Sequence, residues 1–116
     1  MRQKGLDGEF YAAKYLESKG YKIIDRNFHS RFGEIDIIAK ENYTIVFVEV
    51  KLRSNSFFGT PLESITYKKL EKIKKTAMYY LTLNNLANRA YRFDAVEIKI
   101  GVNNERTLNH VENITL

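Results

Sequence analysis

The sequence predicts a single α/β domain with two helices flanking a mixed sheet. Two segments, residues 6–16 and 66–83, carry apolar side chains at helical spacing. The segments around them are rich in β-branched and aromatic residues, which is typical of strands. A chain of 116 residues can bury one compact core but is too short for two ordinary domains, so residues 1–116 are expected to form one unit.

The first half of the chain is predicted to form a helix followed by three strands. Leu6, Phe10 and Leu16 lie on one stripe of a helix of about four turns, and Gly20 follows its C-terminal end. Strands are predicted at residues 21–25, 34–39 and 44–52. Because only residues 40–43 connect the last two, these strands are expected to pair as an antiparallel hairpin.

The second half begins with another amphipathic helix, which is expected to start near Thr66. It has apolar residues on one face and lysines on the other, and Asn84 and Asn85 end it. Residues 91–100 are predicted to form a fourth strand, and residues 106–114 a fifth. The predicted order is therefore helix, three strands, helix and strand, with an extra strand at the C-terminal end.

The composition restricts the classes of function. The absence of cysteine excludes disulfides, zinc sites with thiolate ligands and cysteine nucleophiles, and it fits a cytoplasmic protein. No apolar run approaches the roughly 20 residues of a membrane span, so no membrane partner is expected. The net charge of +5 favours a polyanionic partner without identifying it.

Ionised groups stand within two apolar runs that otherwise resemble core strands. Asp36 lies in the strand predicted at residues 34–39, and Glu49 and Lys51 lie in the next strand. Burial of a carboxylate costs several kcal/mol unless the group finds a partner. Because alternate residues of a strand share a face, Glu49 and Lys51 point the same way, and pairing of the two strands would bring Asp36 near Glu49.

A bound cation is the simplest explanation of these charges. Mg²⁺ prefers oxygen ligands in a near-octahedral array and keeps several waters. The predicted ligands are Asp36, Glu49 and the backbone carbonyl of Val50. Glu9 adds a further acid, because it lies on the apolar stripe of the first helix, from which it would reach the metal or a metal-bound water.

Asp36, Glu49-Val50-Lys51 and a helical Glu9 resemble the constellation of PD-(D/E)xK nucleases, and the order of elements is similar to the restriction-endonuclease-like core of that superfamily. Ile35 stands where the superfamily has proline. More closely, residues 5–114 resemble the YraN-like family of small bacterial proteins, which is related to archaeal Holliday-junction resolvases. The blocks that carry this resemblance are Gly8-Glu9, Gly33-Glu34-Ile35-Asp36, Phe47-Val48-Glu49-Val50-Lys51, Phe58-Gly59 and Arg92-Phe93-Asp94.

The resemblance implies an endonuclease that needs Mg²⁺ or Mn²⁺ and hydrolyses phosphodiester bonds in DNA, branched DNA included. Asp36 and Glu49 would hold the metal, and Glu9 would hold an outer-sphere water or a second ion. Lys51 would orient or deprotonate the attacking water, or stabilise the charge that develops on phosphorus. Because related resolvases cut two strands symmetrically, a homodimer is expected by analogy.

Basic residues are the candidates for contacts with DNA phosphates. Lysines on a surface helix are more often simply solvated, yet their clustering on residues 66–83 makes them the best candidates. Phe57 and Phe58 are candidates for contacts with bases. The predicted nucleic-acid-binding residues are Arg31, Arg53, Lys68, Lys69, Lys72 and Lys75.

Two other classes of function fit the sequence. The first is a nucleic-acid-binding protein of DNA repair or uptake that keeps the nuclease fold with weak or no catalytic activity. The second is a structural scaffold whose acids bind an ion. Glu49 and Lys51, taken singly, are equally well explained as an ion pair at a sheet edge.

Overall fold

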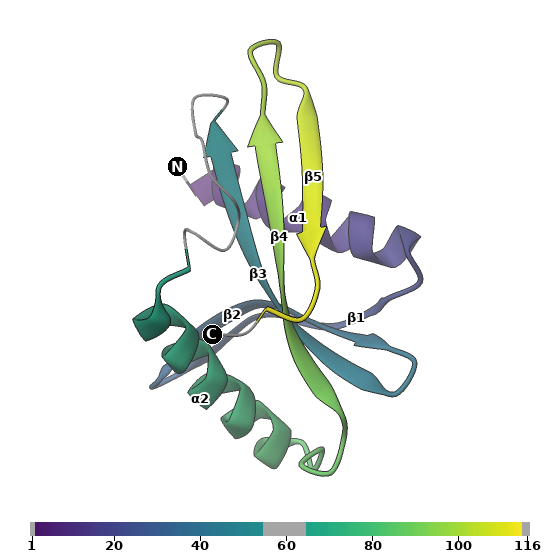
Figure 1. Cartoon of the computed structure of the whole chain (residues 1–116), viewed down its shortest axis with the longest axis vertical. Coiled ribbons are helices and arrows are strands. Elements are labelled where there is room, and N and C mark those ends of the chain that lie inside the picture. The colour runs from purple at the N-terminus through teal and green to yellow at the C-terminus, as the bar shows by residue number, and fades with distance from the viewer. Residues whose placement is uncertain (1, 55–64, 115–116) are drawn as a thin grey trace.

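The computed structural model describes residues 2–54 and 65–114 and has the predicted α/β architecture, a five-stranded mixed sheet with two helices (Figure 1). Across the described ranges, neither helix combines the length and the apolar character needed to traverse a bilayer. The elements, in chain order, are α1 (Arg2–Ser18), β1 (Lys22–Ser30), β2 (Gly33–Glu41), β3 (Thr44–Ser54), α2 (Tyr67–Leu83), β4 (Tyr91–Ile100) and β5 (Arg106–Val111).

The strands lie in the sheet in the order in which they occur in the chain, from β1 to β5. The pair β3 and β4 is parallel, and the other three neighbouring pairs are antiparallel. Parallel neighbours need a long crossover connection, and α2 lies in the connection between β3 and β4. The predicted hairpin of β2 and β3 is confirmed, with Asn42 and Tyr43 as its turn and Asn42 in a left-handed conformation (φ 56°).

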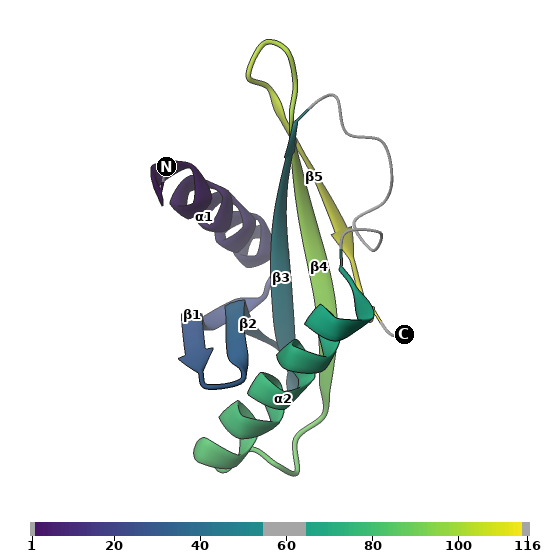
Figure 2. The same ribbon diagram turned by 90° about the vertical axis from the view of Figure 1, so that its left-hand side faces the viewer.

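The two faces of the sheet carry separate apolar cores. Ala12 and Leu16 of α1 pack in one core with Val46 and Val48 of β3. The buried apolar residues of α2 pack in the other core with Phe47. Phe47 therefore points to the face opposite to that of Val46 and Val48, which confirms the alternation of side chains predicted for β3. Figure 2 shows α1 beside β3 and α2 crossing the lower part of β3 and β4.

Strand β1 is longer than the sequence predicted. It continues to Ser30 instead of ending at Asp25, so His29 lies in the strand opposite Glu34 and not in a loop. The added residues are mostly polar and only partly buried, because β1 is an edge strand, and their composition therefore resembles that of a loop. At the other end, β5 stops at Val111, before the predicted Ile114.

A buried ionic network joins β4 to β5. Asp94 is fully buried, and its carboxylate contacts Arg92 Nε at 3.0 Å and His110 Nε2 at 2.8 Å. The backbone N–H of Asn113 donates a third hydrogen bond to it at 2.9 Å. These partners lower the pKa of Asp94, although burial alone would raise it. Arg92 also reaches Glu41 on β2 at 3.0 Å, so the network spans the sheet.

Candidate active site

The predicted acids meet where β2 and β3 diverge. Within the described strands, their pairing ends at Ile37 and Val48, one residue before Asp36 would face Glu49. Beyond this point an Asp36 side-chain hydrogen bond replaces the strand pairing. Asp36 Oδ2 accepts a hydrogen bond of 2.8 Å from the backbone N–H of Val50. A carboxylate therefore satisfies a backbone donor that the separated strand no longer reaches. This hydrogen bond fixes Asp36 beside the segment that carries Glu49.

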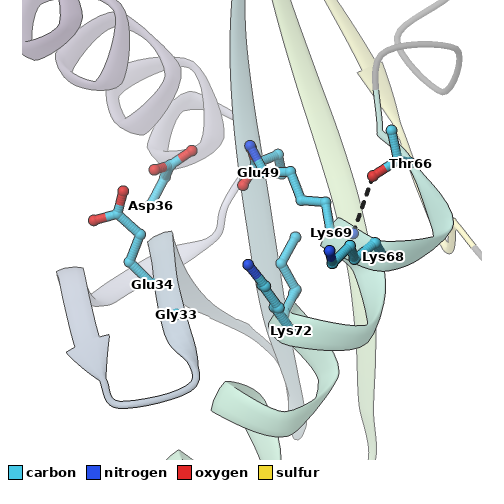
Figure 3. Close-up of a pocket in the computed structure, with 9 residues that line it drawn as sticks. Gly33, Glu34, Asp36, Glu49, Thr66, Lys68, Lys69 and Lys72 are labelled. Carbon is cyan, nitrogen blue, oxygen red and sulfur yellow. Dashed lines mark hydrogen bonds and ion pairs between the residues drawn. The ribbon is translucent and has the colours of Figure 1, made fainter.

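A cavity of about 340 Å³ opens at this divergence, between β2, β3 and α2. Figure 3 shows Glu34 and Asp36 on the β2 side, and Glu49 with the lysines of α2 on the opposite side. The N-terminus of α2 also faces the cavity and adds its own partial positive charge. The residues that line it are Gly33, Glu34, Asp36, Glu49, Thr66, Lys68, Lys69, Lys72 and Ile73.

Two lysines converge on one oxygen of Glu49. The Glu49 side chain is 7% exposed, and its Oε2 lies 3.3 Å from Lys51 Nζ and 2.6 Å from Lys69 Nζ. Burial, together with the neighbouring Lys69, lowers the pKa of Lys51. For Lys69 burial acts in the same direction, but the contact with Glu49 outweighs it and raises the pKa. Of the two ammonium groups, Lys51 is therefore the one that loses its proton more easily.

The carboxylates on the acidic side are held close together and repel one another. Burial, followed by the charges of Glu49 and Glu9, raises the pKa of Asp36 to about 7. Burial also raises the pKa of Glu9, which lies on α1 with Arg26 Nη2 3.9 Å from its Oε1. That Oε1 atom is buried and has no hydrogen-bond partner among the described residues. Asp36 and Glu9 therefore hold their protons to a higher pH than free carboxyl groups do.

This donor set fits a hard divalent cation. Asp36, Glu49 and Glu9 offer carboxylate oxygens, and Val50 lies in the same segment with its carbonyl. In the described ranges, no group of three or more acidic, histidine or cysteine side chains is arranged to hold a metal ion. A cation held by fewer side chains would complete its shell with waters and a backbone carbonyl, which is the usual arrangement for Mg²⁺.

The basic residues predicted to contact DNA fall into three groups. Lys68 and Lys72 are exposed and line the cavity, whereas Lys69 lies beside them but is engaged with Glu49. Arg31 and Lys75 are exposed outside the cavity, near the β1–β2 turn and further along α2. Arg53 forms an ion pair of 3.5 Å with buried Glu97 of β4 and is not among the described lining residues.

The contact between Lys69 and Glu49 is the main feature of the site that sequence reasoning missed. The sequence contained an indication of this contact. Lysines in the first turn of a helix interact unfavourably with the helix dipole, so their presence there suggests a partner for the charge. Lys68 and Lys69 both stand in that turn, which Thr66 caps by accepting a hydrogen bond from Lys69 N at 3.0 Å. Glu34 also lines the cavity, and its Oε1 lies 3.2 Å from His29 Nδ1. The predicted base contacts Phe57 and Phe58 lie outside the described residues.

The fold and the site define a small α/β protein with a mixed five-stranded sheet and an acid–lysine cluster where two strands separate. The chain matches the uncharacterised protein family UPF0102 over residues 8–98 and belongs to that family, which confirms the YraN-like resemblance. It is 48% identical to a UPF0102 protein of Clostridioides difficile (strain 630), covering 97% of this chain and 96% of that one.

Two further relatives show that this likeness extends over most of the chain. A UPF0102 protein of Persephonella marina is 48% identical, over 95% of this chain and 90% of that protein. One of Sulfurihydrogenibium sp. (strain YO3AOP1) is 52% identical, over 84% of each chain. The matched residues 8–98 include all four predicted catalytic residues, Glu9, Asp36, Glu49 and Lys51, and also Lys69.

Proposed function

We propose that this protein is a Mg²⁺-dependent endonuclease that hydrolyses phosphodiester bonds in DNA. The observation that carries the proposal is the cavity with two differently charged sides. Its acidic side holds Glu34 and Asp36, and the lysines Lys68 and Lys72 stand opposite. Glu49 lies on the side of these lysines and contacts Lys51. Binding of a phosphodiester requires a basic side, because the phosphate is negatively charged. Hydrolysis of it also requires an acidic side, because the cation that activates the phosphate is held by carboxylates.

The acids Asp36 and Glu49, with the Val50 carbonyl, would hold the cation, and Glu9 would hold one of its waters. When bound, Mg²⁺ or Mn²⁺ would polarise the scissile phosphate and lower the pKa of the attacking water. The hydrogen bond from Val50 N to Asp36 Oδ2 supports this assignment, because it holds the Asp36 carboxylate in place beside the segment of Glu49.

The lysines would divide the remaining work. Burial lowers the pKa of Lys51, and this lysine would orient the attacking water or accept its proton. Lys68 and Lys72 are exposed at the cavity and would position the phosphates of the bound strand. Glu49 would hold Lys51 at the reacting centre through the contact at 3.3 Å.

The close ion pair of Lys69 favours a second candidate function, a DNA-binding protein without nuclease activity. Lys69 and Lys51 already neutralise Glu49, which would weaken its affinity for a cation. Such a protein would keep the basic side of the cavity for phosphates and would not cut. A third candidate is a structural protein that binds an ion but not DNA, and the experiment has to distinguish it from the other two.

The test is a cleavage assay with linear duplex, single-stranded, flapped and four-way-junction DNA, in Mg²⁺, Mn²⁺ or EDTA. Glu49→Gln and Asp36→Asn are the matched controls, because each removes a charge and keeps the shape of the side chain. Metal-dependent cleavage that both variants abolish supports the nuclease. Cleavage that survives in both variants comes from a contaminant and overturns it. DNA binding without cleavage supports the second candidate, and light scattering of the same sample tests the expected homodimer.

A further inference from the structure

A partly exposed aromatic pair stands outside the cavity, at the β1–β2 turn. Phe32 in this turn and Tyr79 on α2 have ring centroids 6.5 Å apart, with their planes at 67°. Phe28 of β1 supports Tyr79 from below, with centroids 6.2 Å apart. Tyr79 is nevertheless 45% exposed, so much of its ring faces solvent. An aromatic ring held in place with a free face is suited to stacking on another planar group.

The surface is hollowed on both sides of this pair. One hollow, of about 380 Å³, is lined by Ser30, Arg31, Phe32 and Tyr79. The other, of about 470 Å³, is lined by Phe32, Lys75, Met78, Tyr79 and Thr82. Phe32 and Tyr79 line both hollows, and the second hollow is shallow and open to solvent.

The surroundings of the pair are basic. The Arg31 guanidinium carbon lies 5.1 Å from the centroid of the Phe32 ring, and Lys75 lines the second hollow. Neither hollow has an acidic side chain among its described lining residues. A planar group with negative charge nearby would therefore be favoured, and a second copy of this basic surface would be repelled.

A stripe of side chains connects the pair to the candidate active site. Lys68, Lys72, Lys75 and Tyr79 follow one another along α2 at intervals of three or four residues, so they share one side of the helix. Lys68 and Lys72 line the cavity, and Tyr79 lies about two turns, or about 10 Å, beyond Lys72. All four are exposed, so one extended ligand could contact the cavity and the aromatic pair together.

The pair is also fixed in position. Ser30 Oγ lies 3.3 Å from Thr76 Oγ1 on α2 and accepts a hydrogen bond of 3.0 Å from Phe32 N. Gly33 follows directly, where a Cβ atom would meet Lys72 and Thr76 at 3.5 Å. The turn that carries Phe32 is therefore anchored to the helix that carries Tyr79. A site formed before the ligand arrives loses less entropy on binding.

We propose that Phe32 and Tyr79 stack on unpaired bases, and that the protein binds DNA with a single-stranded segment next to the position of cleavage. The phosphates of this segment would lie on Lys72, Lys75 and Arg31. Aromatic rings beside a basic track are the usual means of binding single strands without sequence preference. A paired base cannot reach such a ring without leaving its stack. The proposal rests on the proposed function, since it assigns the substrate of the same cavity.

The test measures fluorescence anisotropy of labelled DNA in EDTA, where no cleavage occurs. A blunt duplex, the same duplex with a single-stranded extension and the isolated single strand are compared for four proteins. These are the native chain, Tyr79→Ala, Tyr79→Phe and Tyr43→Ala, the last removing an exposed ring at the far β2–β3 turn. Tyr79→Ala should weaken binding of the two DNAs with unpaired bases about 5- to 100-fold and change duplex binding less than about twofold. Tyr79→Phe and Tyr43→Ala should bind as the native chain does.

The other outcomes overturn the proposal in distinguishable ways. Equal losses for all three DNAs would make Tyr79 a general contact, and no loss would leave the pair without a role in binding. A native dimer that Tyr79→Ala converts to a monomer in light scattering would make this surface an interface between copies. If duplex cleavage persists while unpaired DNA gives no advantage, this proposal fails and the nuclease stands. If no DNA is bound or cut, the proposed function fails and this proposal with it.

Discussion

Lys69 of α2 and Glu49 of β3 form an ion pair of 2.6 Å across the candidate active site. This contact joins the crossover helix to the strand that carries the predicted metal ligand. It also places an ammonium group where a cation bound to Glu49 would stand. Lys69 and the proposed Mg²⁺ would therefore compete for the same carboxylate, and occupancy of the site would depend on which of them Glu49 contacts.

Removal of this competitor should strengthen metal binding. We expect Lys69→Met to raise the affinity for Mg²⁺ about 2- to 10-fold in calorimetric titration, because Glu49 is then less neutralised. The Lys69 side chain of the ion pair with Glu49 is partly exposed. Without metal, Lys69→Met should therefore lower the free energy of unfolding only slightly, by about 1 kcal/mol or less. Lys68→Met in the same helical turn is the matched control and should change neither quantity. A weaker affinity for Mg²⁺ in Lys69→Met would show that Lys69 supports the cation site.

The raised pKa of Asp36 predicts an unusual dependence of stability on pH. Its pKa is raised to about 7 by burial and then by Glu49 and Glu9, whereas it is about 3.9 in an unfolded chain. A raised pKa stabilises the fold below about pH 4, and this contribution is lost as the pH rises through about 7. Asparagine cannot ionise, so Asp36→Asn should be more stable than the native chain at pH 8 without metal, by on the order of 2–4 kcal/mol.

Urea unfolding in EDTA at pH 4.5 and pH 8 measures this difference, which should nearly vanish at the lower pH. Asp25→Asn on the edge strand β1 provides the comparison for a carboxylate outside the cavity. Added Mg²⁺ should then stabilise the native chain and leave Asp36→Asn unchanged. An equal gain for Asp36→Asn at both pH values would mean that packing, and not charge, causes it.

Lys51 is expected to act through its proton. Lys51→Met should lower the cleavage rate about 10²- to 10⁴-fold, the usual contribution of a general base, with DNA binding within about threefold of the native value. Lys51→Arg is the informative variant, because arginine keeps the charge but cannot lose its proton. It should be as slow as Lys51→Met in single-turnover assays. Nearly native cleavage by Lys51→Arg would assign Lys51 to charge stabilisation instead.

The ionic network around Asp94 should support the fold and not the chemistry. Asp94→Asn would leave the Arg92 charge without its buried counter-ion and weaken the hydrogen bond to His110, at a cost of about 2–4 kcal/mol in the free energy of unfolding. Because the pKa of Asp94 is lowered in the folded state, the native chain should lose this contribution as the pH falls below about 4 and acid protonates Asp94. Urea unfolding gives both quantities. A cleavage defect at temperatures where Asp94→Asn remains folded would connect the network to the site.

Most of the candidate site could be predicted because it depends on short-range geometry. Strand alternation places Glu49 and Lys51 on one face, and a short hairpin turn brings Asp36 beside the segment that carries them. Both features have a fixed period or length that is visible in the order of residues. The five strands and two helices could be predicted for the same reason, with the polar second half of β1 as the main exception.

The remaining features depend on how distant elements pack. Lys69 reaches Glu49 only because the apolar face of α2, with Leu70 and Ile73, lies over the same side of the sheet as Phe47. The pairing of Phe32 with Tyr79 likewise requires a turn and a helix that are far apart in the chain. No local pattern specifies the angle at which a helix crosses a sheet, since that angle follows from the shapes of many side chains.

The turn at Asn42 and Tyr43 determines more than the end of a hairpin. It sets the register in which β2 pairs with β3, and only that register brings Asp36 beside the segment that carries Glu49. One residue added anywhere between these two acids would turn one of them to the opposite face of the sheet. Homologous chains that keep this chemistry should therefore tolerate insertions at the tip of the β4–β5 hairpin but not in the β2–β3 hairpin. The length of one short connection thus constrains how this family can diverge.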